Sequence, residues 1–137
     1  MKLNPYLNFD GQCRAAFQHY EKVLGGKIAF IMTWGEMPNP DPPLPPETKD
    51  LIMHVTMTVG DQTLQGADSP PGRYQAPHGI VVALHYKDKA EGEKVFKALA
   101  DGGKTTMDFQ ETFWADGFGM CVDKFGIPWM VNCEKER

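Results

Sequence analysis

The stretch that decides the fold is Glu111-Thr-Phe-Trp-Ala-Asp-Gly-Phe-Gly-Met-Cys-Val-Asp-Lys-Phe-Gly-Ile-Pro-Trp-Met-Val-Asn132. It contains two apolar runs, residues 118–122 and 127–131, with the length and composition of β-strands. Between them, Asp123-Lys-Phe-Gly126 places an aspartate and a glycine at the spacing of a tight turn. The stretch therefore predicts a β-hairpin.

The same order of predicted elements occurs twice along the chain. Each copy begins with an extended run and continues into a helix that ends at a Gly-Gly pair, with Asp10 and Asp88 as the expected N-caps. Leu24-Gly-Gly-Lys27 and Leu99-Ala-Asp-Gly-Gly-Lys104 end these helices and place two lysines 77 positions apart (104 − 27). We therefore predict two βαβββ modules. The expected strands are 1–9, 27–34, 51–59 and 62–67 in the first copy, and 79–86, 104–111, 119–122 and 127–133 in the second.

These modules predict one domain over residues 1–137, with module 1 at about 1–68, a linker at about 69–78 and module 2 at about 79–137. No predicted strand is long enough to be stable alone. We therefore expect an α+β fold whose modules form a curved, mostly antiparallel half-barrel sheet with the helices outside. Residues 35–50 contain six prolines, which exclude a helix or a central strand. This excursion is a spacer, a lid over a site or an arm onto a partner subunit.

Composition narrows the class of protein. With 137 residues, of which 42% are hydrophobic, the chain can bury a core without disulfides or a metal. Its net charge of −4 is spread without charged blocks, which argues against nucleic-acid binding. No apolar run approaches the roughly 20 residues of a transmembrane helix, and no secretion signal is evident, so we expect a cytoplasmic protein without a membrane partner. Cys13, Cys121 and Cys133 lack paired spacing and are expected to be reduced structural thiols.

Five motifs distributed over nearly the whole chain carry a family resemblance. They are Pro5-Tyr-Leu-Asn-Phe-Asp-Gly11, Ala16-Phe17-x-x-Tyr20-x-x-Val23-Leu24-Gly-Gly26, Ile52-Met-His54, Gln110-Glu-Thr-Phe-Trp114 and Asp123-x-Phe-Gly-x-Pro-Trp-Met130. Together they resemble the vicinal oxygen chelate superfamily of glyoxalases, bleomycin-resistance proteins and extradiol dioxygenases, in particular its PhnB-like branch. Some relatives are labelled as ubiquinone-pathway methyltransferases. We do not expect that activity, because the chain has no glycine-rich loop after a strand of a Rossmann-like unit.

The resemblance implies a divalent metal held by His, Glu or Gln side chains from the first and last strands of each module, where it acts as a Lewis acid. In this sequence the four positions fall near Asn4, Gln65, Val81 and Met130. Val81 and Met130 cannot bind a hard divalent ion, and the two amides offer only neutral oxygens. We therefore expect that the inherited metal site is absent and that the protein needs no cofactor.

Alternate residues of a strand share a face, which predicts the side chains that line a cleft. Tyr6 and Asn8 share a face with Asn4, His85 shares one with Val81, and Asn132 shares one with Met130. Trp34 and Trp114 are expected in a pocket, whereas Trp129 is expected in the core. His54 and His85 can equally be hydrogen-bonded structural residues. The expected cleft consists of Asn4, Tyr6, Asn8, Trp34, His54, Gln65, His85, Trp114, Met130 and Asn132.

Several functions stay open from the sequence. Glu111 is either a carboxylate desolvated by its aromatic neighbours, and so a general base, or a solvated strand-end residue. His54, His85 and Glu111 together have the chemistry of a new iron or zinc site, if they converge. We expect first a metal-free small-molecule binder, second a lyase, isomerase or dioxygenase that uses such a metal site or Glu111 or His85 as base, and third a regulatory module with a vestigial cleft. The resemblance also implies a homodimer.

Overall fold

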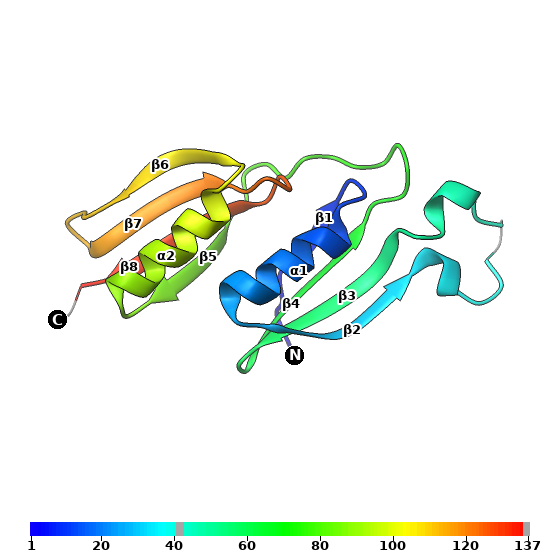
Figure 1. The fold of residues 1–137 in the computed structure, drawn as a ribbon, viewed down its shortest axis with the longest axis horizontal. Helices are drawn as coiled ribbons and strands as arrows, with labels where there is room; N and C mark the ends of the chain where they lie inside the picture. The colour runs from blue at the N-terminus through cyan, green and yellow to red at the C-terminus, as the bar shows by residue number, and fades with distance from the viewer. Residues whose placement is uncertain (41–42, 136–137) are drawn as a thin grey trace. The chain divides into compact units, whose positions relative to one another are not determined.

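The computed structural model describes residues 1–40 and 43–135 (Figure 1). The chain divides into two compact units, Met1–Gln75 and Ala76–Arg137. Among the described residues, each unit has one α-helix and one four-stranded mixed sheet in the order β-α-β-β-β. The α+β class and the two modules are therefore confirmed. Each module forms a sheet of its own, where the sequence interpretation had placed both modules in one half-barrel sheet.

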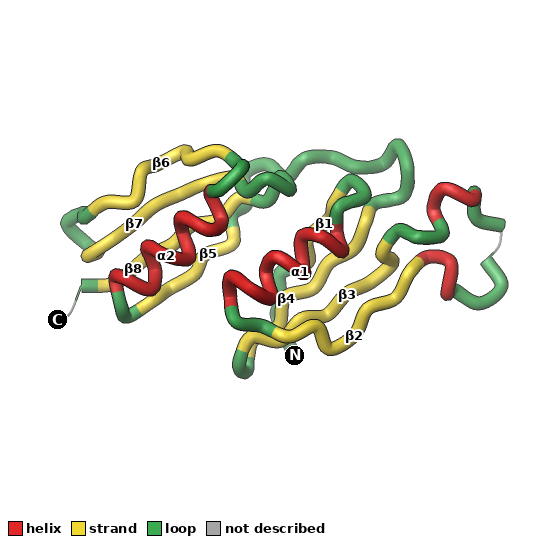
Figure 2. Tube along the Cα trace, viewed as in Figure 1, coloured by secondary structure: helices red, strands yellow, loops and turns green. Residues whose placement is uncertain are grey.

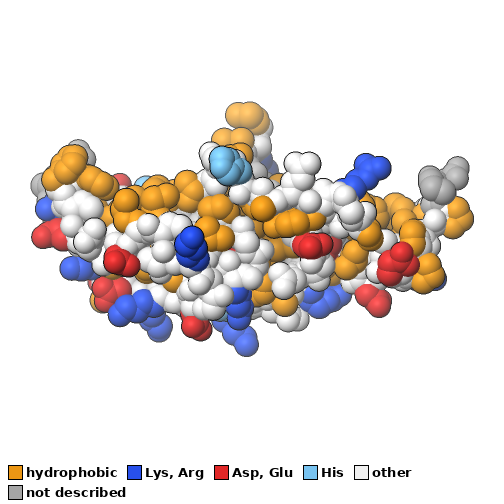
Figure 3. Space-filling view, turned by 90° about the horizontal axis from the view of Figure 1, so that it is seen from above, with side chains coloured by type: hydrophobic (Ala, Val, Ile, Leu, Met, Phe, Trp, Pro, Cys, Tyr) orange, Lys and Arg blue, Asp and Glu red, His pale blue; other side chains and the backbone are white. Residues whose placement is uncertain are grey.

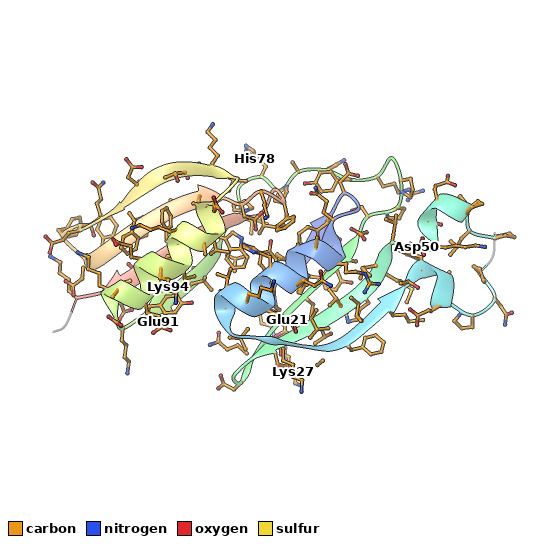
Figure 4. All side chains as sticks on the ribbon, viewed as in Figure 1. Glu21, Lys27, Asp50, His78, Glu91 and Lys94 are labelled. Atoms are coloured by element: carbon orange, nitrogen blue, oxygen red, sulfur yellow. The ribbon has the colours of Figure 1, made fainter. Side chains whose placement is uncertain are left out.

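The first module consists of β1 (Tyr6–Phe9), α1 (Cys13–Leu24), β2 (Lys27–Thr33), β3 (Ile52–Val59) and β4 (Gln62–Asp68). Its sheet has the order β1-β4-β3-β2, in which β1 is parallel to β4 and the other pairings are antiparallel. Helix α1 lies over one face of this sheet (Figure 1). Glu21 of α1 also connects the helix to β2, because its Oε2 accepts the Ile28 N–H at 2.8 Å. Figure 4 labels Glu21 and Lys27, the residue before Ile28.

The second module repeats this connectivity with β5 (Val82–Tyr86), α2 (Lys89–Ala100), β6 (Lys104–Gln110), β7 (Ala115–Val122) and β8 (Pro128–Glu134). Its sheet has the order β5-β8-β7-β6 and again one parallel pair, β5 with β8. Lys27 and Lys104 are the first residues of β2 and β6, so the equivalence predicted from the repeated Gly-Gly-Lys is confirmed. No helix among the described residues has the length and apolarity needed to cross a bilayer.

The two helices begin in different ways. Asp88 caps α2 as predicted, and its side chain accepts the Ala90 N–H at 3.1 Å. The prediction that Asp10 caps α1 is wrong, because α1 begins at Cys13 and its N-cap makes no side-chain hydrogen bond. Asp68, at the end of β4, supplies the missing acceptor: its Oδ1 accepts the Cys13 N–H at 3.0 Å. A residue distant in sequence thus does what a local cap was expected to do.

Two buried aspartates hold strand ends together. Asp68 also accepts the Ile52 N–H at 2.8 Å, so one carboxylate joins β4, β3 and α1. Asp123, in the turn between β7 and β8, accepts the N–H of Ile127 at 3.0 Å and the Trp129 Nε1–H at 2.8 Å. The hairpin predicted from residues 111–132 is confirmed, although β7 begins at Ala115, earlier than expected.

Each helix approaches its sheet closely because a small residue lies at the contact. A Cβ at Gly66 of β4 would lie 2.7 Å from the Phe17 ring, and one at Gly119 of β7 would lie 2.7 Å from Phe96. In α2, a Cβ at Gly92 would overlap the Cys133 sulfur. The helix-facing sides of both sheets are consequently well packed, and Trp129 is 1% exposed in the core as predicted.

The three cysteines are reduced and buried, as the sequence predicted. Burial raises the pKa of the Cys121 thiol to about 11 and also raises the pKa values of Cys13 and Cys133. Since only the thiolate is a good nucleophile, these side chains act as packing groups near neutral pH.

The proline-rich excursion lies between β2 and β3 (Figure 2). It contains two single turns of 3₁₀-helix, Trp34–Glu36 and Pro46–Thr48, although the prolines were expected to exclude helix. Proline is tolerated in a first helical turn, where its missing N–H has no intrahelical partner, and Pro46 occupies such a position. The expectation of an extended excursion also covers residues 41–42, which lie outside the described residues.

The Gly92 contact predicts an unusual response to a helix-favouring substitution. Gly→Ala within a helix normally stabilises by about 1 kcal/mol. We expect Gly92→Ala instead to lower the free energy of unfolding of the protein by about 1–3 kcal/mol, because the new methyl group overlaps Cys133 Sγ. Urea denaturation measures the change.

A double-mutant cycle separates this overlap from a general effect. Cys133→Ala removes the sulfur, so the Gly92→Ala/Cys133→Ala protein should lose less stability than the sum of the two single variants. Gly92→Ala/Cys13→Ala is the matched control, since Cys13 lies in the other module, and it should be additive. Stabilisation by Gly92→Ala alone would contradict the close contact.

Candidate functional site

A chain of hydrogen-bonded polar side chains crosses the face of the first sheet that turns away from α1. Tyr6 Oη lies 3.1 Å from His54 Nδ1, and His54 Nε2 lies 2.9 Å from Thr56 Oγ1. Gln65 Nε2 donates to the same threonine hydroxyl at 3.3 Å. We call Tyr6, His54, Thr56 and Gln65 the polar chain. Its members come from β1, β3 and β4, which are neighbours in the sheet.

Strand register explains why these four side chains meet. Gln65 is the Cα partner of Tyr6 on one side and of Thr56 on the other, so the three share a face. His54 shares that face with Thr56 because they are two residues apart on β3. The intervening residues, among them Leu7, Val55 and Leu64, are buried on the side of α1. The polar chain therefore rests on a rigid sheet rather than on loops.

Exposed aromatic rings flank the polar chain. Phe30 of β2 is 52% exposed, and its ring centroid lies 6.0 Å from that of His54. Tyr6 is 45% exposed, and its ring centroid lies 5.7 Å from that of His54. Burial of part of the Tyr6 ring raises the pKa of its hydroxyl, so the phenol keeps its proton at neutral pH. The face thus combines accessible apolar rings with a protonated hydroxyl group.

Both ring nitrogens of His54 are engaged within the polar chain. Which of the two nitrogens donates depends on the tautomer, because a neutral imidazole carries one N–H and one acceptor nitrogen. In this arrangement neither nitrogen presents a free lone pair to a metal ion. His54 consequently orients its neighbours.

The corresponding face of the second sheet is mostly apolar. Met130 pairs with Ala83 on β5 and with Met120 on β7. On the same face, Asn132 Nδ2 lies 3.2 Å from His85 Nδ1. Asn132 Oδ1 is buried and has no hydrogen-bond partner in the described part of the chain. An unpaired buried acceptor of this kind is uncommon in folded proteins.

An aromatic cluster is exposed at the start of β7. The ring of Trp114 makes edge contacts with Phe113, at a centroid distance of 4.9 Å, and with Phe118, at 5.3 Å. Phe113 is 89% exposed and Trp114 is 45% exposed. Figure 3 shows that apolar side chains reach the surface at many points between the charged ones. Trp114 therefore belongs to an exposed apolar patch of the second module.

The four positions expected for a family metal do not fit a divalent ion. Asn4 precedes β1 and Val81 precedes β5, so the strand neighbours of Gln65 and Met130 are Tyr6 and Ala83. Tyr6 is protonated, and Gln65 offers only a neutral amide oxygen. Residues 1–40 and 43–135 contain no group of three or more His, Cys, Asp or Glu side chains placed to hold a metal.

The sequence left two interpretations of Glu111, and the structure favours the solvated one. Glu111 follows β6, 67% of its side chain is exposed, and its carboxylate lies 3.6 Å from Lys135 Nζ. The desolvation required for a strong general base is therefore absent at this position. His85 and Glu111 belong to the second unit and His54 to the first.

Trp34 lies outside the polar chain. It begins the excursion after β2 and lines a pocket of about 510 Å³ together with residues of the linker after β4. Sequence reasoning missed this pocket. Its only signal was the presence of prolines in two separated segments, residues 43–45 and 70–71. The expectation that all ten predicted residues share one cleft spans both units and stays a prediction.

Comparison with known proteins identifies the family. The sequence model described as 3-demethylubiquinone-9 3-methyltransferase matches residues 1–132. Protein YjdN of Escherichia coli (strain K12) is 35% identical over 146 residues, an alignment that covers 100% of this chain and 98% of that protein.

Solved structures share the fold. Protein PA1353 from Pseudomonas aeruginosa is 41% identical, with a TM-score of 0.90 and coverage of 99% of both chains. A Bacillus cereus structure described as putative 3-demethylubiquinone-9 3-methyltransferase, PhnB protein, shares the fold at 21% identity, with a TM-score of 0.80 and coverage of 97% of this chain and 99% of that one. A glyoxylase/bleomycin resistance protein/dioxygenase domain from Frankia sp. EAN1pec shares it at 12% identity and a TM-score of 0.63, covering 97% and 94%. The chain therefore belongs to the family that the 3-demethylubiquinone-9 3-methyltransferase model describes, and it shares its fold with the PhnB protein and with the glyoxylase/bleomycin resistance protein/dioxygenase domain.

Proposed function

We propose that the protein binds a small organic molecule, without a metal ion, on the face of the first sheet that carries the polar chain. The observation that supports this most directly is the hydrogen-bonded arrangement of Tyr6, His54, Thr56 and Gln65 beside the exposed ring of Phe30. Binding sites for small molecules typically combine apolar walls with a few fixed polar groups. This face has both, on strands whose register fixes them.

The polar chain favours a flat ligand that carries a carbonyl oxygen. When His54 donates from Nδ1 to the Tyr6 oxygen, the Tyr6 proton remains available for an acceptor outside the chain. A ligand ring can then pack on Phe30 while its carbonyl oxygen accepts from Tyr6.

The name of the family does not carry its activity to this chain. Both sheets are mixed and four-stranded, each from one βαβββ module, whereas the Rossmann-like cofactor fold is built on a mostly parallel sheet wound with helices on both faces. Function depends on the site rather than on a label or a fold. Binding, and not methyl transfer, is therefore the function we propose, in a protein that we predict from its sequence to be cytoplasmic.

Removal of the Tyr6 hydroxyl tests the ligand site. A panel of aromatic ketones and quinones is screened by thermal shift, and the dissociation constants of the hits are measured by calorimetry. We expect Tyr6→Phe to weaken binding about fivefold, the effect of one lost neutral hydrogen bond of about 1 kcal/mol.

Tyr74→Phe is the matched control, because Tyr74 lies in the linker and takes part in none of the hydrogen bonds that define the polar chain. It should leave affinity unchanged. Equal affinities of the Tyr6→Phe and wild-type proteins for every hit would place the site elsewhere. A complete lack of hits would favour the regulatory module with a vestigial cleft.

Metal titration tests the second part of the proposal. Elemental analysis follows purification without added metal or chelator, and the protein is then titrated with Fe²⁺, Mn²⁺, Ni²⁺ and Zn²⁺. Because the strand neighbours Tyr6/Gln65 and Ala83/Met130 provide no charged ligand, we expect no stoichiometric binding. A stoichiometric ion that is lost in His54→Ala or His85→Ala would overturn the metal-free site and restore the lyase or dioxygenase alternative.

We also propose a homodimer. Each sheet has two edge strands, β1 and β2 in one and β5 and β6 in the other, and the second module exposes Phe113 beside Trp114. Edge strands and exposed apolar patches of this kind are commonly covered in symmetric assemblies.

Analytical ultracentrifugation at micromolar concentration tests this assembly. The wild-type protein should sediment as a dimer, and Phe113→Ser should shift it toward monomer, because the substitution removes exposed apolar area. Ile80→Ser is the control, because it also removes an exposed apolar side chain of the second module. Sedimentation of the wild type as a monomer would overturn the proposal.

A further inference from the structure

The proline-rich excursion folds against the linker that follows β4, and the two segments enclose a pocket of about 510 Å³. Its walls include Trp34, Met37, Leu44 and Pro45 from the excursion and Pro71 and Arg73 from the linker. All of these residues belong to the first unit, and none of them belongs to the polar chain. The volume lies within the range of about 300–1,000 Å³ typical of sites for small molecules.

Hydrogen bonds hold the walls of this pocket in place. The Trp34 N–H donates to the Leu51 carbonyl at 2.9 Å, which closes the base of the excursion next to Asp50 (Figure 4). On the far wall, the buried Thr48 hydroxyl donates to the Pro45 carbonyl at 2.7 Å. Prolines add fixed φ angles at several lining positions. A pocket held in this way loses little conformational entropy when a ligand enters.

The lining is largely apolar, but it includes an unpartnered indole N–H and an exposed guanidinium group. Trp34 Nε1 is buried and has no hydrogen-bond partner among the described residues. Arg73 takes part in neither of the two ion pairs found in residues 1–40 and 43–135. Glu47 also lines the pocket and contributes the opposite charge. A ligand that brings an anionic oxygen can accept from the unpartnered indole N–H, and Arg73 is the side chain suited to pair with its charge.

We propose that this pocket is a second binding site, which takes an aromatic carboxylic acid. The ring of the acid packs against Trp34 and the prolines, and its carboxylate pairs with Arg73. This site is independent of the proposed function on the sheet face, because it shares no residue with the polar chain. It also gives the excursion a role as the wall of a pocket.

Titration with 2-naphthoate tests the site, with uncharged 2-naphthalenemethanol as the matched neutral probe. Affinities are measured by calorimetry, and the indole N–H signals of the uniformly ¹⁵N-labelled protein are followed by NMR. We expect 2-naphthoate to move the Trp34 signal, which is identified by its loss in Trp34→Phe. The Trp129 indole is bonded to Asp123 and should stay in place.

Charge variants define the contact. Arg73→Gln should weaken the binding of 2-naphthoate about five- to tenfold, because it removes a charge-assisted hydrogen bond that is partly exposed to water. The affinity for the neutral probe should not change. Arg14→Gln, an exposed arginine of α1, is the control and should have no effect. Glu47→Gln should increase the affinity for 2-naphthoate about twofold, because it removes a negative charge that repels the carboxylate of the ligand.

Three outcomes overturn the proposal. One is a wild-type protein that does not bind 2-naphthoate at millimolar concentration. Another is equal weakening by Arg73→Gln and Arg14→Gln, which would show a nonspecific charge effect. The third is that Tyr6→Phe loses 2-naphthoate binding while Arg73→Gln binds it as tightly as the wild type. That result would assign the acid to the sheet face and support the proposed function alone.

Discussion

One helix of 12 residues covers each four-stranded sheet, and this constraint shapes the rest of the molecule. A single helix buries one face only, and it does so by close approach over Gly66 and Gly119. Most of the buried apolar residues of each module therefore lie on the helix side, where burial stabilises them. Within a module, the opposite face is free of that packing requirement, so polar and exposed aromatic side chains can occupy it.

The two modules use that freedom differently, although their connectivity is the same. At equivalent pairings of a first and a last strand, the first module places Tyr6 beside Gln65 and the second places Ala83 beside Met130. The first pair belongs to a hydrogen-bonded chain, whereas the second lies among methionines. At this equivalent pairing, hydrogen-bonding side chains are therefore found in the first module and apolar side chains in the second.

Much of the fold could be predicted from local chemistry. Asp123 and Gly126 set a turn within four residues, and the Asp88 cap needs only the adjacent backbone, so sequence reasoning located both. Sequence reasoning could also predict which side chains of a strand share one face of the sheet, because alternation along a strand is a local rule. The errors arose where a distant group intervened. Asp68 replaced Asp10 at the start of α1, and the first and last strands of each module closed separate sheets.

The sequence by itself determined the α+β class and the duplicated βαβββ plan, because these depend on residue type and periodicity. Only the tertiary structure decided which side chains act together. The polar chain requires the register of three strands, and the Trp34 pocket requires an excursion and a linker that are separated by β3 and β4 in the sequence. The exposure of Glu111 likewise depends on what packs around it. Such contacts join residues distant in the chain, and no local pattern of residue types specifies them.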